Sequence, residues 1–356
     1  MKKIIALALG LLLCMAALAA GEALVSRSYL EGAFSQALDA AINPRLDASD
    51  ETLRARLGAS MPEREPDAAP ASGMWELKEG DVLSGYTGMS VTLLGGEVQL
   101  KAPGGAVVDV TEGTEVYGGH SLCPGHRYIV TENTAAAFTV TSAAAVLYSE
   151  GGGTLTASDG PDYYALARAL RTLGLFQGSG SGIGEGFDLH LAPTRGEGLV
   201  MFLRILGEED AALAYTGTHP FTDVPGWLDR YVAWAWAQGY ANGVAPGLFG
   251  GGQTLSAVEY EEFLLRALGY SRAGVDDYAT SLERALNCGA LTSGEYVMLR
   301  EEPFLRAQVA YISYHALDLP VGGGSETLAQ RLTAAGALTA EQLAQAKSQI
   351  ASGRIF

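Results

Sequence analysis

Two arginines stand at the first positions of expected helices, where a positive charge is unusual. Arg195 follows Thr194 and lies two residues before Glu197, and Arg306 opens a second expected helix. A cation in the first turn opposes the helix dipole, which favours anions there. Each arginine therefore needs a partner, either a carboxylate of this chain or an anionic group on a ligand. The planar guanidinium matches a carboxylate bidentately, and a helix N-terminus adds free N–H donors.

The glutamates near these helix starts have a structural explanation of their own. Thr194 with Glu197, and Ser256 with Glu259, have the spacing of a capping box. In this motif the two side chains satisfy backbone donors of the first helical turn, which is worth about 1 kcal/mol. Capping does not explain the arginines, and the residues alone leave a carboxylate of this chain and an anionic ligand equally open as their partners.

Other patterns that could support catalysis are sparse. His120 and His126 lie in strand–turn sequence, but no further histidine or glutamate completes a metal-ligand set. The chain contains no nucleophile elbow, no H-E-x-x-H helix and no zinc-type cysteine cluster. Acidic pairs such as Glu208-Glu209 are expected to be solvated loop charges. We therefore assign no catalytic residue, no metal and no cofactor, and we predict that the protein is not an enzyme.

The candidate residues belong to a repeated unit, whose clearest copy is Phe221–Tyr270. A Pro-Gly turn opens this copy, a helix containing Tyr231 and Trp234 follows, and a glycine-rich loop precedes a second helix. Upstream and downstream stretches repeat the pattern in degenerate form. The expected copies span about 158–217, 218–270 and 271–320.

The central copy resembles the S-layer homology module. The resemblance rests on FTDVPGW, an aromatic helix, GYANG, Gly-Leu-Phe and a capped second helix, in three copies in order. It implies one pseudo-threefold helical domain that binds cell-wall polysaccharide, commonly a pyruvylated polymer. It also implies ligand contacts from the matching positions, which are Arg195, Arg306, Glu197, Glu259, Trp236 and Gly243. With this resemblance we expect the two arginine side chains to be exposed and available to a ligand.

The copies depart from the family pattern in places. Ala257 stands in the second copy where the first has Arg195, and the third has Leu305 and Gln308 in place of the capping pair. We therefore expect one weakened pocket and a less secure third helix start. Among the tryptophans, Trp236 is the one expected to be exposed.

The composition limits the partners. The 356 residues carry a formal net charge of −17, which disfavours nucleic acid and adsorption to anionic lipid. Residues 1–20 read as a cleaved secretory signal with a basic start and an apolar core. The protein is therefore expected to be secreted, at the cell wall or cell surface, without a membrane anchor after cleavage. Self-association there is an open possibility.

The remaining segments complete a multidomain α+β organisation. Residues 21–73 read as a helical segment and linker, and 74–157 as a small antiparallel β domain. An all-α domain of three helix–loop–helix repeats over 158–320 follows, and then a helical tail, 321–356, that packs on the third repeat and frays. The sequence favours a non-catalytic cell-wall protein. The alternative is a wall-tethered carbohydrate-active enzyme or ligand-binding protein whose site lies in the β domain.

Overall fold

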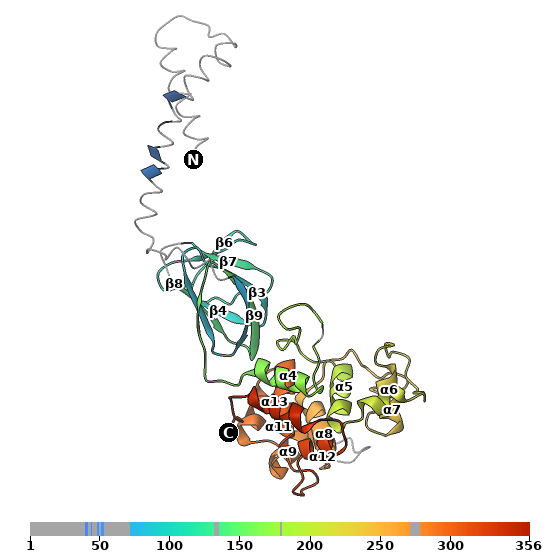
Figure 1. The fold of residues 1–356 in the computed structure, drawn as a ribbon. Coiled ribbons are helices and arrows are strands. Elements are labelled where there is room, and N and C mark those ends of the chain that lie inside the picture. Colours follow the sequence, from blue (N-terminus) through green and yellow to red (C-terminus); the bar gives the residue numbers. More distant parts are fainter. Residues whose placement is uncertain are drawn as a thin grey trace, which may run out of the picture. The chain divides into compact units, whose positions relative to one another are not determined.

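The computed structural model describes residues 72–131, 135–178, 180–270 and 278–356, with isolated positions between 40 and 52. The chain divides into two units, Met1–Ala69 and Pro70–Phe356, and every element below belongs to the second. The expected signal, 1–20, and most of 21–73 lie outside the described residues. Antiparallel sheets come first along the chain and helices follow, so the fold is mixed α+β (Figure 1).

Two antiparallel sheets form the β region. One has the order β1-β9-β3-β7-β5-β6 and the other β10-β2-β8-β4. The strands are β1 (Gly73–Lys78), β2 (Val82–Tyr86), β3 (Ser90–Gly95), β4 (Val98–Lys101), β5 (Val107–Asp109), β6 (Thr114–Val116), β7 (Arg127–Val130), β8 (Ala135–Val140), β9 (Ala144–Glu150) and β10 (Thr154–Thr156).

Alternating side chains explain how these strands form a core. In β4, Val98 and Leu100 are buried and the alternate residues Gln99 and Lys101 are exposed, which is the period-two pattern of a half-buried strand. Phe138 of β8 and Tyr128 of β7 lie in the same hydrophobic cluster. Glycines turn the chain between strands. Gly96 has φ of +86°, and a Cβ there would lie 2.4 Å from the carbonyl oxygen of Ala144.

Strand β9 contributes to two hydrophobic cores. Ala145 and Leu147 point into the β core, whereas Ala144 and Val146 belong to the core formed with the helices. Adjacent residues of a strand point to opposite faces, so one strand serves both. The β region is therefore not closed off from the helices by a polar boundary.

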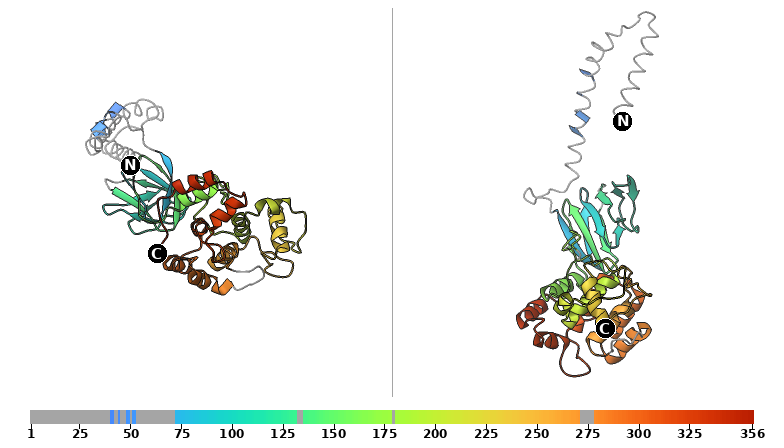
Figure 2. Two further views of the ribbon diagram at one scale, coloured as in Figure 1. Left: turned by 60° about the horizontal axis from the view of Figure 1, so that its bottom comes forward. Right: turned by 90° about the vertical axis from the view of Figure 1, so that its right-hand side faces the viewer.

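The helices follow in chain order and gather apart from the strands (Figure 2). They are α4 (Tyr163–Thr172), α5 (Arg195–Leu206), α6 (Glu209–Ala214), α7 (Asp229–Ala237), α8 (Ala257–Ala267), α9 (Ser281–Cys288), α10 (Ser293–Glu301), α11 (Arg306–Ala316), α12 (Leu328–Ala334) and α13 (Ala340–Ser348), with a short 3₁₀ turn, η2 (Tyr278–Thr280). Gly207 and Gly289 end α5 and α9 in the left-handed conformation that glycine adopts without strain. The rings of Phe202 and Phe263 stack at 4.7 Å between α5 and α8.

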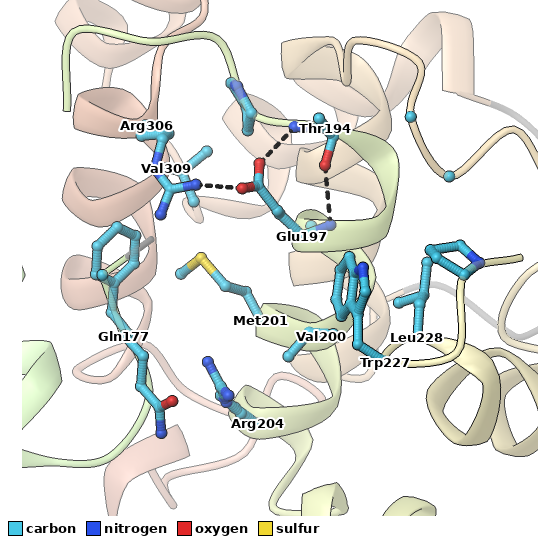
Figure 3. Close-up of a pocket in the computed structure, with 17 residues that line it drawn as sticks. Gln177, Thr194, Glu197, Val200, Met201, Arg204, Trp227, Leu228, Arg306 and Val309 are labelled. Atoms are coloured by element: carbon cyan, nitrogen blue, oxygen red, sulfur yellow. Dashed lines mark hydrogen bonds and ion pairs between the residues drawn. The ribbon is translucent and has the colours of Figure 1, made fainter. Parts of the chain in front are cut away.

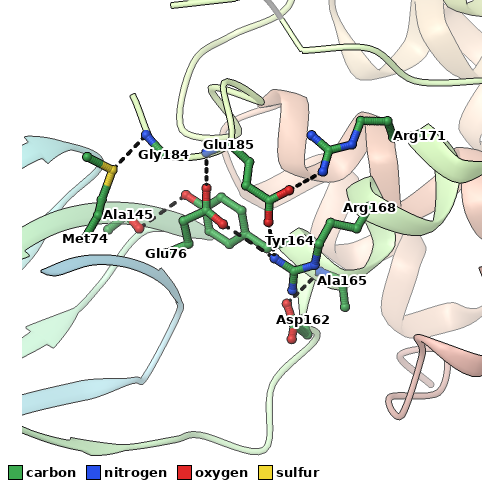
Figure 4. A network of polar contacts seen from close by, with 10 residues as sticks. All are labelled: Met74, Glu76, Ala145, Asp162, Tyr164, Ala165, Arg168, Arg171, Gly184 and Glu185. Atoms are coloured by element: carbon green, nitrogen blue, oxygen red, sulfur yellow. Dashed lines mark hydrogen bonds and ion pairs between the residues drawn. The ribbon is translucent and has the colours of Figure 1, made fainter. Parts of the chain in front are cut away.

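A polar network joins β1 to α4 and to the glycine-rich loop before α5 (Figure 4). The Glu76 carboxylate accepts the backbone N–H of Glu185 at 2.6 Å, and Arg168 pairs with both glutamates. Gly184 has φ of +55°, and a Cβ there would lie 2.4 Å from Glu76 Oε1. This loop therefore needs glycine because it lies directly against β1. Burial, opposed by the Glu185 hydrogen bond, raises the pKa of Glu76.

The last residues are attached rather than frayed, so that expectation is wrong. Gln342 and Gln349 of the α13 region donate to the carbonyl and hydroxyl oxygens of Thr172 at the end of α4. Beyond α13, Arg354 pairs with Glu295 of α10, which lies within 271–320. Long-range polar contacts hold the tail, and the local sequence pattern does not reveal them.

Candidate functional site

The capped helix starts form as the sequence predicts. At α5, Glu197 Oε2 accepts the Thr194 N–H at 2.8 Å and Thr194 Oγ1 accepts the Glu197 N–H at 3.3 Å. At α8, Ser256 donates its N–H and its hydroxyl to Glu259. At α11 a leucine cannot accept, so only the reverse bond forms, from the Leu305 N–H to the side chain of Gln308 at 3.0 Å.

Arg306 reaches from the start of α11 to the start of α5. Its Nη1 pairs with Glu197 Oε1 at 2.5 Å, and its Nε donates to the carbonyl oxygen of Phe187 at 3.0 Å. The guanidinium carbon lies 5.5 Å from the ring centroid of Phe176. The residue is only 7% exposed, so the expectation of an exposed Arg306 side chain is wrong. Its partner is a carboxylate of this chain.

Arg195 makes the equivalent contact between the start of α5 and the start of α8. Its Nη1 lies 3.3 Å from Glu259 Oε1 of α8, and its Nη2 donates to the carbonyl oxygen of Asn242 at 2.8 Å. The guanidinium carbon lies 5.4 Å from the ring centroid of Phe249. Arg195 is also 7% exposed, so the expectation of an exposed side chain is wrong here too. Each arginine thus joins the first turns of two helices.

The first amides of these helices are occupied as well. Arg195 and Gly196 donate their N–H groups to the carbonyls of Gln253 and Gly251 at 2.8 and 2.9 Å. The N–H of Arg306 donates to Leu191 at 2.8 Å. The expectation of free N–H donors for a ligand is therefore wrong at these positions. The donors hold one capped helix against the loop before another.

The described residues at the matching positions of α8 and α11 form no such ion pair between these two helices. Ala257 occupies the first position of α8, and Gln308 replaces the glutamate in the first turn of α11. Gln308 is 1% exposed. A glutamate buried there without a cation would be costly, because a buried charge needs a partner. The absence of an arginine at position 257 and of a glutamate at position 308 are therefore consistent with each other, because neither residue leaves a buried charge unpaired.

A cleft of about 590 Å³ opens beside the Arg306–Glu197 pair (Figure 3). It runs along α5 between the loop after α4, the turn before α7 and the start of α11. The residues that line it are Phe176, Gln177, Gly178, Pro193, Thr194, Glu197, Gly198, Val200, Met201, Arg204, Pro225, Trp227, Leu228, Gly251, Gly252, Arg306 and Val309. Two of the predicted site residues, Glu197 and Arg306, help to line it.

The cleft combines an exposed aromatic ring with cations. Trp227 is 60% exposed and stands beside Glu197 and Val200 in Figure 3. Arg204 lines the same cleft and pairs with Glu209 at 2.8 Å. Within the described residues, Nη2 of Arg306 has no hydrogen bond, so this arginine retains donors for a further acceptor. An indole face beside guanidinium groups suits a ligand with apolar ring faces and anionic substituents.

Four of the six predicted site residues do not line this cleft, namely Arg195, Glu259, Trp236 and Gly243. Trp236 is 40% exposed, as expected, and its ring meets that of Phe221 edge-on at 5.3 Å. Gly243 is fixed by packing, because a Cβ there would lie 2.4 Å from Cε1 of Phe221 and 2.5 Å from the carbonyl oxygen of Leu248. Their ligand-binding role remains a prediction, as does that of Arg195, Arg306, Glu197 and Glu259.

Sequence reasoning missed several roles in this region. Asp223 accepts the N–H groups of Phe249 and Gly250 at 2.7 and 2.8 Å, and these hydrogen bonds hold its pKa below the ordinary value. Asp223 thereby closes the glycine-rich loop that forms one wall of the cleft. The Asp-Val-Pro-Gly turn in the sequence is the signal that could have indicated this role of Asp223. Trp227, at the end of that turn, is more exposed than Trp236, so the expectation that Trp236 alone is the exposed tryptophan is wrong.

The acidic pair at the end of α5 is not solvated as expected. Glu208 accepts from Trp234 Nε1 at 2.8 Å and from the Tyr240 hydroxyl at 2.9 Å. Glu209 accepts from the Tyr231 hydroxyl at 2.8 Å. Burial, followed by the hydrogen bond to Glu208, raises the pKa of Tyr240 to about 12. Both carboxylates therefore orient the aromatic face of α7 and its following turn.

The histidines of the β region have structural partners. His126 Nδ1 lies 2.8 Å from Asp109 Oδ2, and Asp109 also accepts the N–H groups of Thr111 and Glu112. His120 contacts the carbonyl oxygen of Tyr117. Across 72–131, 135–178, 180–270 and 278–356, no three His, Cys, Asp or Glu side chains gather as metal ligands.

Comparisons with known proteins leave the family open. No family model matches the chain, and no curated protein matches it. Among solved structures it is similar to procruciferin, an 11S globulin from Brassica napus, at 11% identity over 24% of this chain and 22% of that chain, with a TM-score of 0.17. Pumpkin seed globulin gives 11% identity, 29% of each chain and a TM-score of 0.18. The coconut allergen cocosin gives 14% identity, 32% of this chain, 36% of that chain and a TM-score of 0.16. The chain spans well under half of each structure, and scores this low carry no argument.

Two further findings concern the described residues only. None of their helices has both the length and the apolar character needed to cross a bilayer. Cys123 and Cys288 are free and exposed.

Proposed function

We propose that the protein is a non-catalytic cell-surface protein that binds an anionic cell-wall polysaccharide through the cleft along α5. The observation that carries the proposal is the combination of exposed Trp227 with Arg306 and Arg204 in one cleft of about 590 Å³. Apolar ring faces of sugars stack on an indole, and a carboxylate substituent would accept from the unused Nη2 of Arg306.

The arrangement of helix starts supports the proposed three-repeat organisation of 158–320. Arg306 connects α11 to α5, and Arg195 connects α5 to α8, through the same guanidinium–glutamate contact. We propose that these helices are equivalent elements of three S-layer-homology-like repeats around one pseudo-threefold axis. Under this proposal a pyruvylated polymer is the expected ligand class, and the protein is secreted and retained at the wall.

Because Arg195 and Arg306 are buried, substitutions at these two residues do not test ligand binding alone. Removing Arg195 or Arg306 would also break a buried ion pair, so lost binding could reflect lost stability. Trp227 offers a cleaner test because its side chain is largely exposed. Trp236 is the comparison, because it is an exposed tryptophan outside the cleft whose ligand contact the family resemblance implies, so the two variants separate the two candidate sites.

The experiment measures binding of the full-length protein to purified cell-wall sacculi, with and without their secondary polymer. We expect Trp227→Ala to weaken binding about tenfold, because central aromatic contacts contribute about 1–2 kcal/mol. Trp236→Ala should bind like wild type. Equal loss from both variants, or loss from Trp236→Ala alone, would place the site outside the cleft.

The charge of the ligand can be tested at Gly252, which lines the cleft. A Cβ on Gly252 meets nothing within 4 Å, so a side chain can begin there without a clash at its first atom. Gly252→Glu adds a negative charge that Gly252→Gln, of the same size, lacks. Like-charge repulsion of about 1 kcal/mol should weaken binding of an anionic polymer about fivefold in the glutamate variant relative to the glutamine variant. Equal binding by the two variants would contradict an anionic ligand.

A further inference from the structure

The cleft along α5 carries a local charge of the opposite sign to that of the whole chain. Its charged lining consists of the cations Arg204 and Arg306 and the anion Glu197. Both oxygens of Glu197 are engaged within the chain, Oε1 by Arg306 and Oε2 by the N–H of Thr194. The chain as a whole has a formal net charge of −17 and repels an anionic polymer, so the two arginines decide where such a polymer binds.

Each of these arginines is fixed by partners and keeps one nitrogen unused. Arg204 donates its Nε to Glu209 Oε1 at 2.9 Å, and its Nη2 lies 2.8 Å from the same oxygen. Arg306 uses its Nη1 for Glu197 and its Nε for the carbonyl oxygen of Phe187. Within the described residues, Nη1 of Arg204 and Nη2 of Arg306 have no hydrogen bond, and neither belongs to the buried atoms that lack one, so solvent reaches both. A guanidinium held in this way loses little freedom when it binds a further acceptor.

The two arginines lie at opposite ends of the cleft (Figure 3). Glu197, which holds Arg306, and Arg204 are seven residues apart on α5, so they lie on one face of the helix and about 10 Å apart along its axis. Glu209 follows the end of α5, so its contact holds the Arg204 guanidinium at that end.

A single anionic group cannot contact both arginines. A charge-assisted hydrogen bond is about 2.8 Å long, so one group bridges donors that are no more than about 6 Å apart. A ligand that uses both arginines must therefore carry two anionic groups, separated by about 10 Å. Val200 and Met201 line the cleft between the arginines, where an uncharged part of the ligand can pack.

We propose that the cleft binds its polymer through two anionic groups at once, one on Arg306 and one on Arg204. It thereby selects polysaccharides whose charges lie about 10 Å apart. This inference rests on the proposed function, and it adds the spacing of charge that the ligand must have. A polysaccharide with isolated charges contacts one arginine at a time and binds more weakly.

The experiment uses polymer released from purified sacculi and cut into fragments of increasing length. Calorimetry measures the affinity of each fragment for the full-length protein. In wild type the affinity should rise about tenfold at the first fragment that carries two anionic groups about 10 Å apart, because a second charge-assisted hydrogen bond is added. A series of binding fragments without this step would overturn the proposal and leave the proposed function intact. No binding of any fragment would refute the proposed function itself, and this inference with it.

Substitution of Arg204 locates the second contact. Arg204→Gln should bind fragments with one anionic group as wild type does and should lose the step, whereas Arg204→Lys, which keeps the charge, should recover part of it. The matched control is Arg230→Gln, which changes the net charge equally at an exposed arginine that does not line the cleft. The control should show the full step. A full step in Arg204→Gln, or an equal loss in the control, would overturn the proposal.

The fragments with one anionic group also report whether the variant is folded. Arg204 pairs with Glu209, so its substitution can lower the stability of the protein as well as remove a contact. Unchanged affinity for these short fragments shows that the rest of the cleft is formed. If Arg204→Gln does not fold, the presence or absence of the step in wild type still decides the proposal.

Discussion

Removal of the Arg306 side chain tests whether the buried ion pairs hold the helix starts together. Arg306→Ala deletes the contact to Glu197 and the hydrogen bond to the carbonyl oxygen of Phe187. Hydrogen bonds to charged groups contribute about 1.5–3 kcal/mol each. The Glu197 side chain is 35% exposed, so water would solvate it again and reduce the loss. We therefore expect a destabilisation of about 2–3 kcal/mol.

Thermal unfolding of the full-length protein is the assay. For a unit as large as Pro70–Phe356, each kcal/mol shifts the midpoint by about 2–4 °C, so Arg306→Ala should lower Tm by roughly 5–10 °C. The control is Arg127→Ala. Arg127 also pairs with a glutamate, Glu150, but both side chains are more than two-fifths exposed. Exposed pairs contribute at most about 1 kcal/mol, so the control should lose no more than about 4 °C.

The comparison decides between two readings of Arg306. If Arg306→Ala melts like Arg127→Ala, the buried pair does not hold α11 against α5, and the reasoning from burial fails. If Arg306→Ala is much less stable, binding measurements on this variant cannot be read as loss of a ligand contact alone. That result would justify the use of Trp227 in the binding test.

Two further predictions concern packing and pairing. Gly243→Ala should destabilise the protein by about 1–3 kcal/mol in urea unfolding, because its Cβ would overlap Phe221. The control Gly226→Ala, whose Cβ meets nothing within 4 Å, should stay within about 0.5 kcal/mol of wild type. Equal effects of the two substitutions would contradict the packing argument. Ala257→Arg alone should lower the stability of the protein, because position 257 is buried. Adding Gln308→Glu should recover at least about 1 kcal/mol of the free energy of unfolding, if the new arginine and glutamate pair as Arg195 pairs with Glu259. A double-mutant cycle measures this recovery, and strictly additive effects would contradict it.

Local patterns predicted the ends of elements well. The capping pairs at Thr194 and Ser256 start helices where the sequence places them. These signals act within three or four residues, so they can be read from one stretch of chain. The antiparallel β region was also predicted from its alternating strands and turn residues.

The sequence could not reveal contacts between distant segments. It left open whether Arg195 and Arg306 meet a carboxylate of this chain, and the answer lies 64 and 109 residues away. It treated Glu208 as solvated, although Trp234 and Tyr240 bind it from the next helix and turn. Such partners depend on how helices pack, which no local pattern encodes.

The two faces of β9 limit how this chain can be divided for protein engineering. Transplanting the helical region alone onto another protein would leave behind Ala144 and Val146, and it would open its core to water. Carrying β9 along would strip it from β1 and β3, which hydrogen-bond to it on either side. The smallest part that could be transferred to another protein is therefore the sheets and helices together. The fusion point should lie before β1 rather than between β10 and α4.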